Sequence, residues 1–239
     1  MSDDHIRFIP PAHHRAGAPA PALPLLRHET SLAPAAWLRE AVTTSAASVA
    51  SLLPGHFPAY ARLHHPFEVG GALPAVPETW RELAARYGRE LRDPAAAEAF
   101  AYAGVPGAQA PVGSLPPPVI DALLEHLRPA TATPDSWYFA VWTGFGGSAV
   151  PHDLGPQLQL PYREYHLFSG PLAAARTSYH VVPFWHQSAN LWWPADRAWC
   201  VATEIDHARS YVGGPEARVA AILADARLDA AATTAAAPW

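Results

Sequence analysis

The chain has 239 residues, of which 50% are hydrophobic and 15% charged, so it can bury the core of one domain. Its formal net charge of -5 gives no basic surface for phosphate backbones, and we expect no nucleic-acid partner. One cysteine, Cys200, excludes an internal disulfide and a cysteine-based zinc site.

The first residues, MSDDHIRF, lack the basic and apolar regions of a signal peptide. No window holds the about 18 uninterrupted apolar residues of a membrane-spanning helix. We therefore expect a cytoplasmic protein without a membrane partner.

The two ends of the chain carry no apolar periodicity. Residues 1–29 contain APAPALPLL and scattered histidines, which predict a mobile arm. Residues 230–239 are mostly alanine and threonine, and we expect a frayed tail unless Trp239 docks on the domain. A single domain would then span residues 30–229.

Apolar residues recur every three or four positions in four segments, which predicts four helices. In the first segment this stripe runs from Leu38 to Leu53. In the second it begins with Trp80, which we expect to lie in the core. The predicted helices span residues 30–53, 77–91 and 117–127, and the fourth has Pro215 in its first turn.

Segments rich in aromatic and β-branched residues predict strands, most of them in the second half of the chain. Helices concentrate in the first half, and strands and helices do not alternate regularly. We therefore predict an α+β fold with a mixed or mainly antiparallel sheet. The predicted strands are residues 57–63, 136–143, 162–168, 198–205 and 210–212.

Glu204 and Asp206 are the main candidates for chemistry. They are two residues apart in a predicted strand, so both side chains would leave one face, with carboxylates roughly 7 Å apart along the backbone. Such a pair can act as general acid and base or bind a metal. The alternative is a solvated strand end, or pairing with an arginine such as Arg197 or Arg209.

Other candidate motifs are weaker. Residues 144–147 are glycine-rich, but no helix is predicted after them, so they do not form a dinucleotide-binding turn. They are interpreted as a mobile loop at a pocket rim or an ordinary connection. At His64 and His65 we expect one packed ring and one solvated ring, and apolar neighbours predict a buried, inert Cys200 thiol.

Six tryptophans between residues 137 and 199 exceed what a core of this size needs. Trp192 and Trp193 precede Pro194, which predicts a turn, and we expect at least one of these rings to be exposed and to recognise a partner. Charged neighbours extend this predicted contact surface, whose members are Trp192, Trp193, Asp196, Arg197, Glu204 and Asp206.

The segments SWYFAVWTGFG, YREYHLFSGPL and NLWWPADRAWCVATEID, followed by YVGG, resemble a family of uncharacterised actinobacterial proteins. This resemblance covers roughly residues 37–228 and implies no reaction. The order of helices before strands, with the segment from WPADRAW to the acids, is also similar to the immunity-protein superfamily typified by the yeast cell-wall regulator and its bacterial relatives. That similarity implies a compact α+β domain that binds toxins.

Two functional hypotheses follow. The first is a cofactor-free protein that binds another protein through the contact surface defined above. The alternative is a small-molecule enzyme, hydrolase-like, in which Glu204 and Asp206 act as acid and base or as metal ligands and residues 144–147 form a lid. A concave pocket around both acids would favour the enzyme, and a flat or convex aromatic surface would favour binding.

Overall fold

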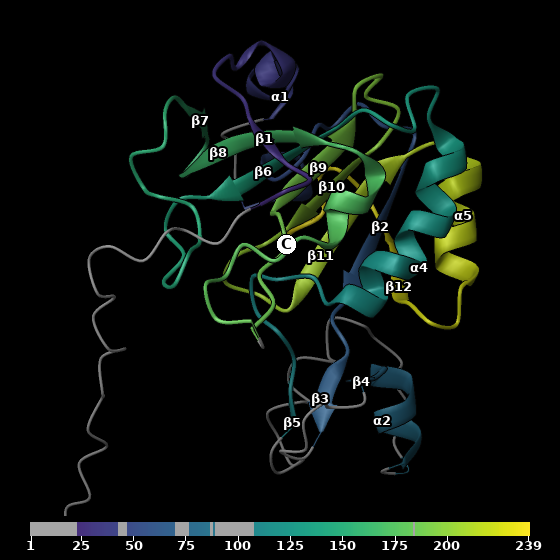
Figure 1. Ribbon diagram of the computed structural model, residues 1–239. Helices are drawn as coiled ribbons and strands as arrows, with labels where there is room; N and C mark the ends of the chain where they lie inside the picture. The colour runs from purple at the N-terminus through teal and green to yellow at the C-terminus, as the bar shows by residue number, and fades with distance from the viewer. Residues whose placement is uncertain (1–22, 43–46, 70–76, 87, 89–107, 184) are drawn as a thin grey trace, which may run out of the picture.

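The computed structural model describes residues 23–42, 47–69, 77–86, 88, 108–183 and 185–239 (Figure 1). These residues form an α+β fold. Helices lie mostly in the first half of the chain and sheet strands mainly in the second, which confirms the predicted fold class.

Nine strands of the described residues form one sheet in which neighbouring strands are antiparallel. The order is β1-β8-β6-β9-β10-β11-β2-β12, and β7 also pairs with β8. The strands are β1 Arg27–His28, β2 Ala59–His64, β6 Trp137–Trp142, β7 Gln157–Leu160, β8 Arg163–Gly170, β9 Leu191–Pro194, β10 Cys200–Thr203, β11 Arg209–Gly214 and β12 Asp229–Thr233.

The α-helices of the described residues are α1 Ala36–Ala41, α2 Trp80–Arg86, α4 Pro117–Leu127 and α5 Glu216–Ala224. A small second sheet, in the order β4-β3-β5, lies near α2 below the main sheet in Figure 1. Its strands are β3 Phe67–Val69, β4 Pro77–Glu78 and β5 Ala108–Gln109.

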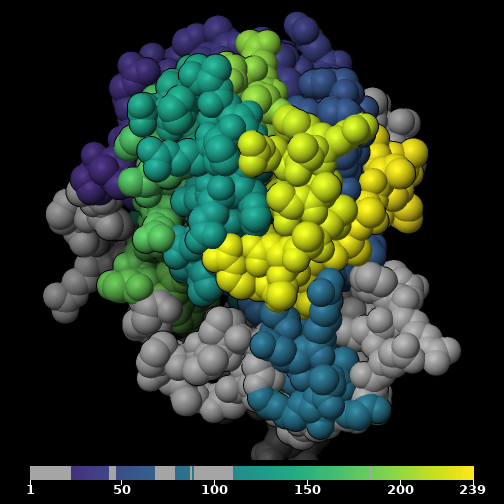
Figure 2. Space-filling model, turned by 90° about the vertical axis from the view of Figure 1, so that its right-hand side faces the viewer, coloured from purple at the N-terminus to yellow at the C-terminus, as the bar shows by residue number. Residues whose placement is uncertain are grey.

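Both faces of the main sheet are buried. Helices α4 and α5 lie side by side over one face, which we call the helix face (Figure 2). The opposite face is covered by α1 with the 3-10 turn Ala33–Ala35 before it, by the 3-10 turn Val49–Ser51 and by the C-terminal residues from 234 to 239. Because each face has its own cover, consecutive residues along the central strands are all buried.

The helix α4 has the predicted bounds, and Trp80 is a core residue as expected, with 2% of its surface exposed. The Trp80 ring packs on Phe67 with centres 4.2 Å apart, and its indole nitrogen donates to the His65 carbonyl over 2.8 Å. The predicted start of the second helix at residue 77 is wrong, because Pro77–Glu78 pair with β3 as strand β4 and α2 begins at Trp80. Residues 87 and 89–91 of the predicted helix lie outside the described residues.

The first predicted helix is wrong in length. Helix α1 ends at Ala41, and Val42 has the extended angles φ -82° and ψ 125°. The sequence continues with Thr43, Thr44 and Ser45, and such β-branched and hydroxyl side chains lower helix propensity. Residues 43–46 themselves lie outside the described residues.

Both predicted domain ends need correction. Residues 1–22 lie outside the described residues, but Arg27–His28 pair with β8 as strand β1, so the arm cannot extend to residue 29. The expected frayed tail begins within β12, and beyond that strand the Trp239 indole nitrogen donates to the Ser51 hydroxyl over 2.9 Å. Paired backbone and a docked ring make these segments part of the domain.

Candidate functional site

The two predicted acids lie in different environments. Glu204 is buried, with 1% of its surface exposed, and forms an ion pair with Arg163. Asp206 exposes 73% of its side chain and approaches Arg163 at 3.6 Å. The expectation that both carboxylates leave one strand face is wrong, because β10 ends at Thr203 and residues 204–208 form a turn. We call residues 204–208 the acid loop.

The geometry gives Glu204 a structural role. One of its oxygens accepts from the Arg163 guanidinium, and the other accepts from the Asp206 backbone N–H over 2.5 Å. A carboxylate with both oxygens engaged and no solvent contact is poorly placed to accept a substrate proton. Among the described residues, no three His, Cys, Asp or Glu side chains form a group that could hold a metal.

The expectation that Trp192 or Trp193 reaches the surface is also wrong. Trp192 is 3% exposed and stacks on Trp137 beneath the helices, with ring centres 5.9 Å apart. Trp193 is fully buried on the opposite face, where its ring meets Trp37 with centres 6.0 Å apart. Consecutive side chains of a strand point to opposite faces, and here both faces are covered.

Asp196 and Arg197 are separated from the acids by the length of β10. They form the turn that joins β9 to β10, whereas the acid loop joins β10 to β11 at the other end of these strands. Asp196 accepts from the Ala132 N–H over 2.6 Å, and the Arg197 guanidinium lies over the Trp37 ring. The six predicted contact residues therefore do not form one surface.

The expectation of one packed and one solvated ring at His64 and His65 is wrong, since both rings are buried. The His65 ring nitrogens lie 2.6 Å from the Pro111 carbonyl oxygen and 2.8 Å from the Ser210 hydroxyl. Burial lowers the pKa of His65 to about 4. This serine-histidine contact is closed to solvent and ties the chain at Pro111 to the sheet.

The glycine-rich segment is held as an ordinary connection. Gly147 has φ +74°, and a Cβ there would lie 2.5 Å from His180 Nε2, so the close approach requires glycine. The Gly147 carbonyl accepts from the Val181 N–H over 2.9 Å, and Ser148 forms a β-bridge with His180. These contacts favour the connection over the lid.

Cys200 is a free, fully buried thiol, as predicted, and burial raises its pKa. A thiol in such surroundings is not a nucleophile at neutral pH.

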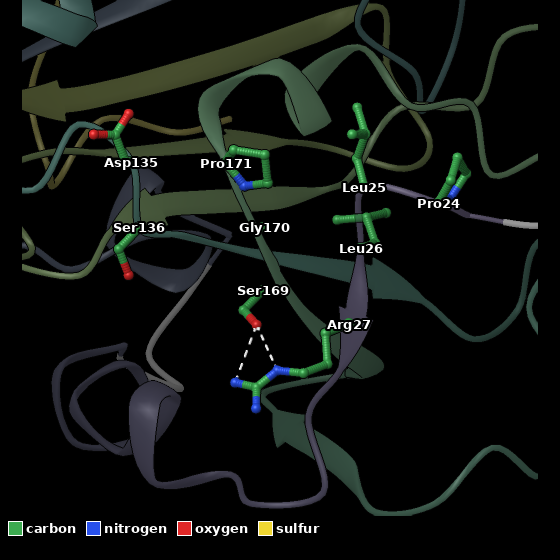
Figure 3. Close-up of a pocket in the computed structure, with 9 residues that line it drawn as sticks. All are labelled: Pro24, Leu25, Leu26, Arg27, Asp135, Ser136, Ser169, Gly170 and Pro171. Carbon is green, nitrogen blue, oxygen red and sulfur yellow. Dashed lines mark hydrogen bonds between the residues drawn. The ribbon is translucent and has the colours of Figure 1, made fainter.

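A recess of about 400 Å³ lies at the far end of β8 from the acid loop, between residues 24–27, 135–136 and 169–171 (Figure 3). In Figure 3 the Arg27 guanidinium turns toward the Ser169 hydroxyl, 3.4 Å away. Arg27 also pairs with Glu29 at 2.6 Å, so its charge is already compensated. None of the predicted site residues lines this recess.

Exposed apolar side chains gather around the acid loop instead, a feature the sequence analysis missed. The large hydrophobic residues exposed in the described part of the chain are Leu25 (46%), Val112 (48%), Tyr162 (79%) and Trp185 (62%). Leu25 belongs to the recess, and the other three lie near the acid loop.

These three residues are linked to the acid loop through the contacts of their sequence neighbours. Tyr162 precedes Arg163, the partner of both acids. Val112 precedes Gly113, whose N–H donates to the His207 carbonyl over 3.2 Å. Gln187 lies two residues after Trp185, and its side chain donates to the Gly113 carbonyl over 3.1 Å. Periodicity could not reveal this arrangement, because all three residues lie in turns or loops.

Tyr162 is further distinguished by its backbone. It occupies the turn between β7 and β8 with φ 67°, a conformation that costs free energy for a residue with a side chain. The turn thus presents a large ring to solvent at an energetic cost.

Comparison of the chain with family models, curated proteins and solved structures finds no match. Within the described residues, no helix combines the length and apolar character needed to cross a membrane.

Proposed function

We propose that the chain is a cofactor-free binding protein that recognises another protein at the acid loop. The contact surface comprises Val112, Tyr162, Trp185 and Asp206, and we call it the acid-loop surface. The observation that carries this proposal is that three exposed hydrophobic residues each lie within two positions of a residue bonded to the acid loop or to Gly113 beside it, and that this loop exposes a carboxylate. Apolar patches with a charged rim are typical of protein interfaces.

This proposal keeps the predicted binding function and Asp206 but moves the aromatic contacts. Tyr162 and Trp185 take the place of the buried Trp192 and Trp193. Asp206 favours a partner segment that presents a basic side chain beside apolar ones, in line with the net charge of -5. The toxin binding implied by the immunity-protein resemblance and the cytoplasmic location remain predictions.

The hydrolase-like alternative receives no comparable support. Its acid and base would be Glu204 and Asp206, yet Glu204 is enclosed and already accepts two hydrogen bonds. The recess with volume for a small molecule lies at the other end of β8.

Affinity capture from the producing cells tests the proposed surface with three single variants. We expect one retained protein with the wild type and with the control Leu25→Ala, which alters an exposed residue at the recess. Trp185→Ala and Tyr162→Ala should each weaken binding of that partner, once purified, by about 2 kcal/mol, the scale of an interface hot spot. Equal affinity for all four proteins would contradict the proposal.

A further inference from the structure

Two histidines meet at the edge of the sheet where β1 and β7 both pair with β8 (Figure 1). His28 of β1 and His166 of β8 have ring centres 6.3 Å apart, with planes inclined by 67°. Gly155 lies against His28 with φ +60°, and a Cβ there would be 2.6 Å from His28 Cε1. The turn before β7 thus contacts His28 at Gly155, where glycine permits the approach, and His166 through the Leu154 carbonyl.

The hydrogen bonding of His166 fixes its tautomer. Its Nδ1 lies 3.1 Å from the Leu154 carbonyl oxygen, which can only accept, so Nδ1 carries the hydrogen. In the neutral ring, Nε2 then holds a lone pair. His166 is 1% exposed, so this lone pair is shielded from water.

The Nε2 atoms of His28 and His166 are both buried and have no hydrogen-bond partner among the described residues. Burying an unsatisfied polar atom destabilises the fold, and such atoms are uncommon in folded proteins. A cation bound by both rings would satisfy the two atoms at once.

We propose that His28 and His166 bind a divalent transition-metal ion of the Zn²⁺ type. Imidazole nitrogen is a preferred ligand of such ions, and a metal-bound histidine commonly donates its other ring N–H to a backbone carbonyl, as His166 does to Leu154. A zinc–nitrogen bond of about 2.0–2.1 Å separates the centres of two ligating rings by roughly 5–6 Å, so a small ring adjustment from 6.3 Å is enough.

The site has two protein ligands. No third His, Cys, Asp or Glu of the described residues joins them in a metal-binding group, so the affinity is below that of a structural zinc site with four protein ligands. The bound ion would fasten β1 to β8. This site is independent of the acid-loop surface, and its occupancy neither requires nor excludes a protein partner there.

Calorimetric titration of the metal-free full chain with ZnCl₂ tests the site. We expect one equivalent to bind, with about tenfold or greater weakening in His28→Ala and in His166→Gln. His126→Ala is the matched control, because His126 contacts Asp225 at 2.8 Å, away from the β1–β8 edge, and should leave the titration unchanged. A double His13→Ala, His14→Ala variant controls for binding by adjacent histidines elsewhere in the sequence.

Equal zinc affinity in the wild type, His28→Ala and His166→Gln would overturn the proposal, and so would loss of binding in either control. His166 is buried, so circular dichroism should accompany each titration. If His166→Gln does not fold, the half-buried His28 decides the result through His28→Ala. A wild type that binds no zinc would overturn the proposal as well.

Discussion

The two faces of the sheet are equally dry but are covered by different kinds of structure. On the helix face, α4 and α5 supply regular apolar stripes that the sequence pattern predicts. On the opposite face, the cover consists of the six-residue α1, two 3-10 turns and the C-terminal residues. Such short, irregular segments carry no apolar periodicity in the sequence. The sequence pattern therefore did not predict that this face is buried.

The largest expected effects come from one tryptophan on each face. Trp199→Ala on the helix face should cost about 5 kcal/mol of unfolding free energy, the upper end for such substitutions, because it also leaves the Leu127 carbonyl without its 3.0 Å hydrogen bond. Trp193→Ala should cost about 3 kcal/mol, since the Trp193 indole nitrogen has no partner among the described residues. Urea unfolding followed by circular dichroism measures both losses of unfolding free energy. A larger loss for Trp193→Ala than for Trp199→Ala would contradict the expected order.

The buried ion pair beside the acid loop should give the next effect. Arg163→Ala leaves the Glu204 carboxylate buried without its countercharge and should cost about 3 kcal/mol by the same measurement. The control is Arg176→Ala, which breaks the exposed pair with Asp121 and should cost less than about 1 kcal/mol. Similar losses in both variants would show that Glu204 is not desolvated.

Removal of residues 234–239 should affect the opposite face alone. It deletes the Trp239–Ser51 hydrogen bond and the backbone bonds from Val49 and Ala50 to the tail, a loss of about 2 kcal/mol. Hydrogen exchange should accelerate at the Val49 and Ala50 amides and stay unchanged in α4. Uniform acceleration in both regions would mean that the two covers unfold together.

The smallest expected effect is a pH dependence of the unfolding free energy, and it comes from the buried His65 and not from the cover of either face. The folded-state pKa of His65, about 4, lies below its ordinary value of 6.5, so His65 contributes stability that is present above pH 6.5 and is lost as the pH falls toward 4. Between pH 7.5 and 5.5 this loss is about 1 kcal/mol. His65→Phe should reduce the pH dependence of urea unfolding without abolishing it, because burial also lowers the pKa of His186 to about 4. An unchanged slope would place His65 in contact with solvent.

The sequence predicted elements whose pattern is complete within one segment. The stripe of α4 and the aromatic run of β6 need no information from distant residues, and both were located correctly. Strand β9 was missed because Trp192-Trp193-Pro194 was interpreted as a turn, an interpretation that assumes one solvated side. Only the tertiary cover explains why both rings are dry.

The candidate site was less predictable, for the same physical reason. Asp206 is exposed, in line with the alternative of a solvated strand end, but Glu204 is paired with Arg163 from a strand 41 positions earlier instead of with Arg197 or Arg209. No spacing rule connects those two residues. Tyr162 and Trp185 likewise lie near the acid loop through tertiary contacts alone.

The placement of β2 affects how the chain can fold during synthesis. Its partners on both sides come from the last part of the chain, since Ala61 pairs with Val212 of β11 and with Ala232 of β12. A ribosome that has released β2 must therefore complete most of the remaining sequence before that strand can pair. Until then its apolar residues have no native partners on either side, so the nascent chain should depend on chaperones during elongation.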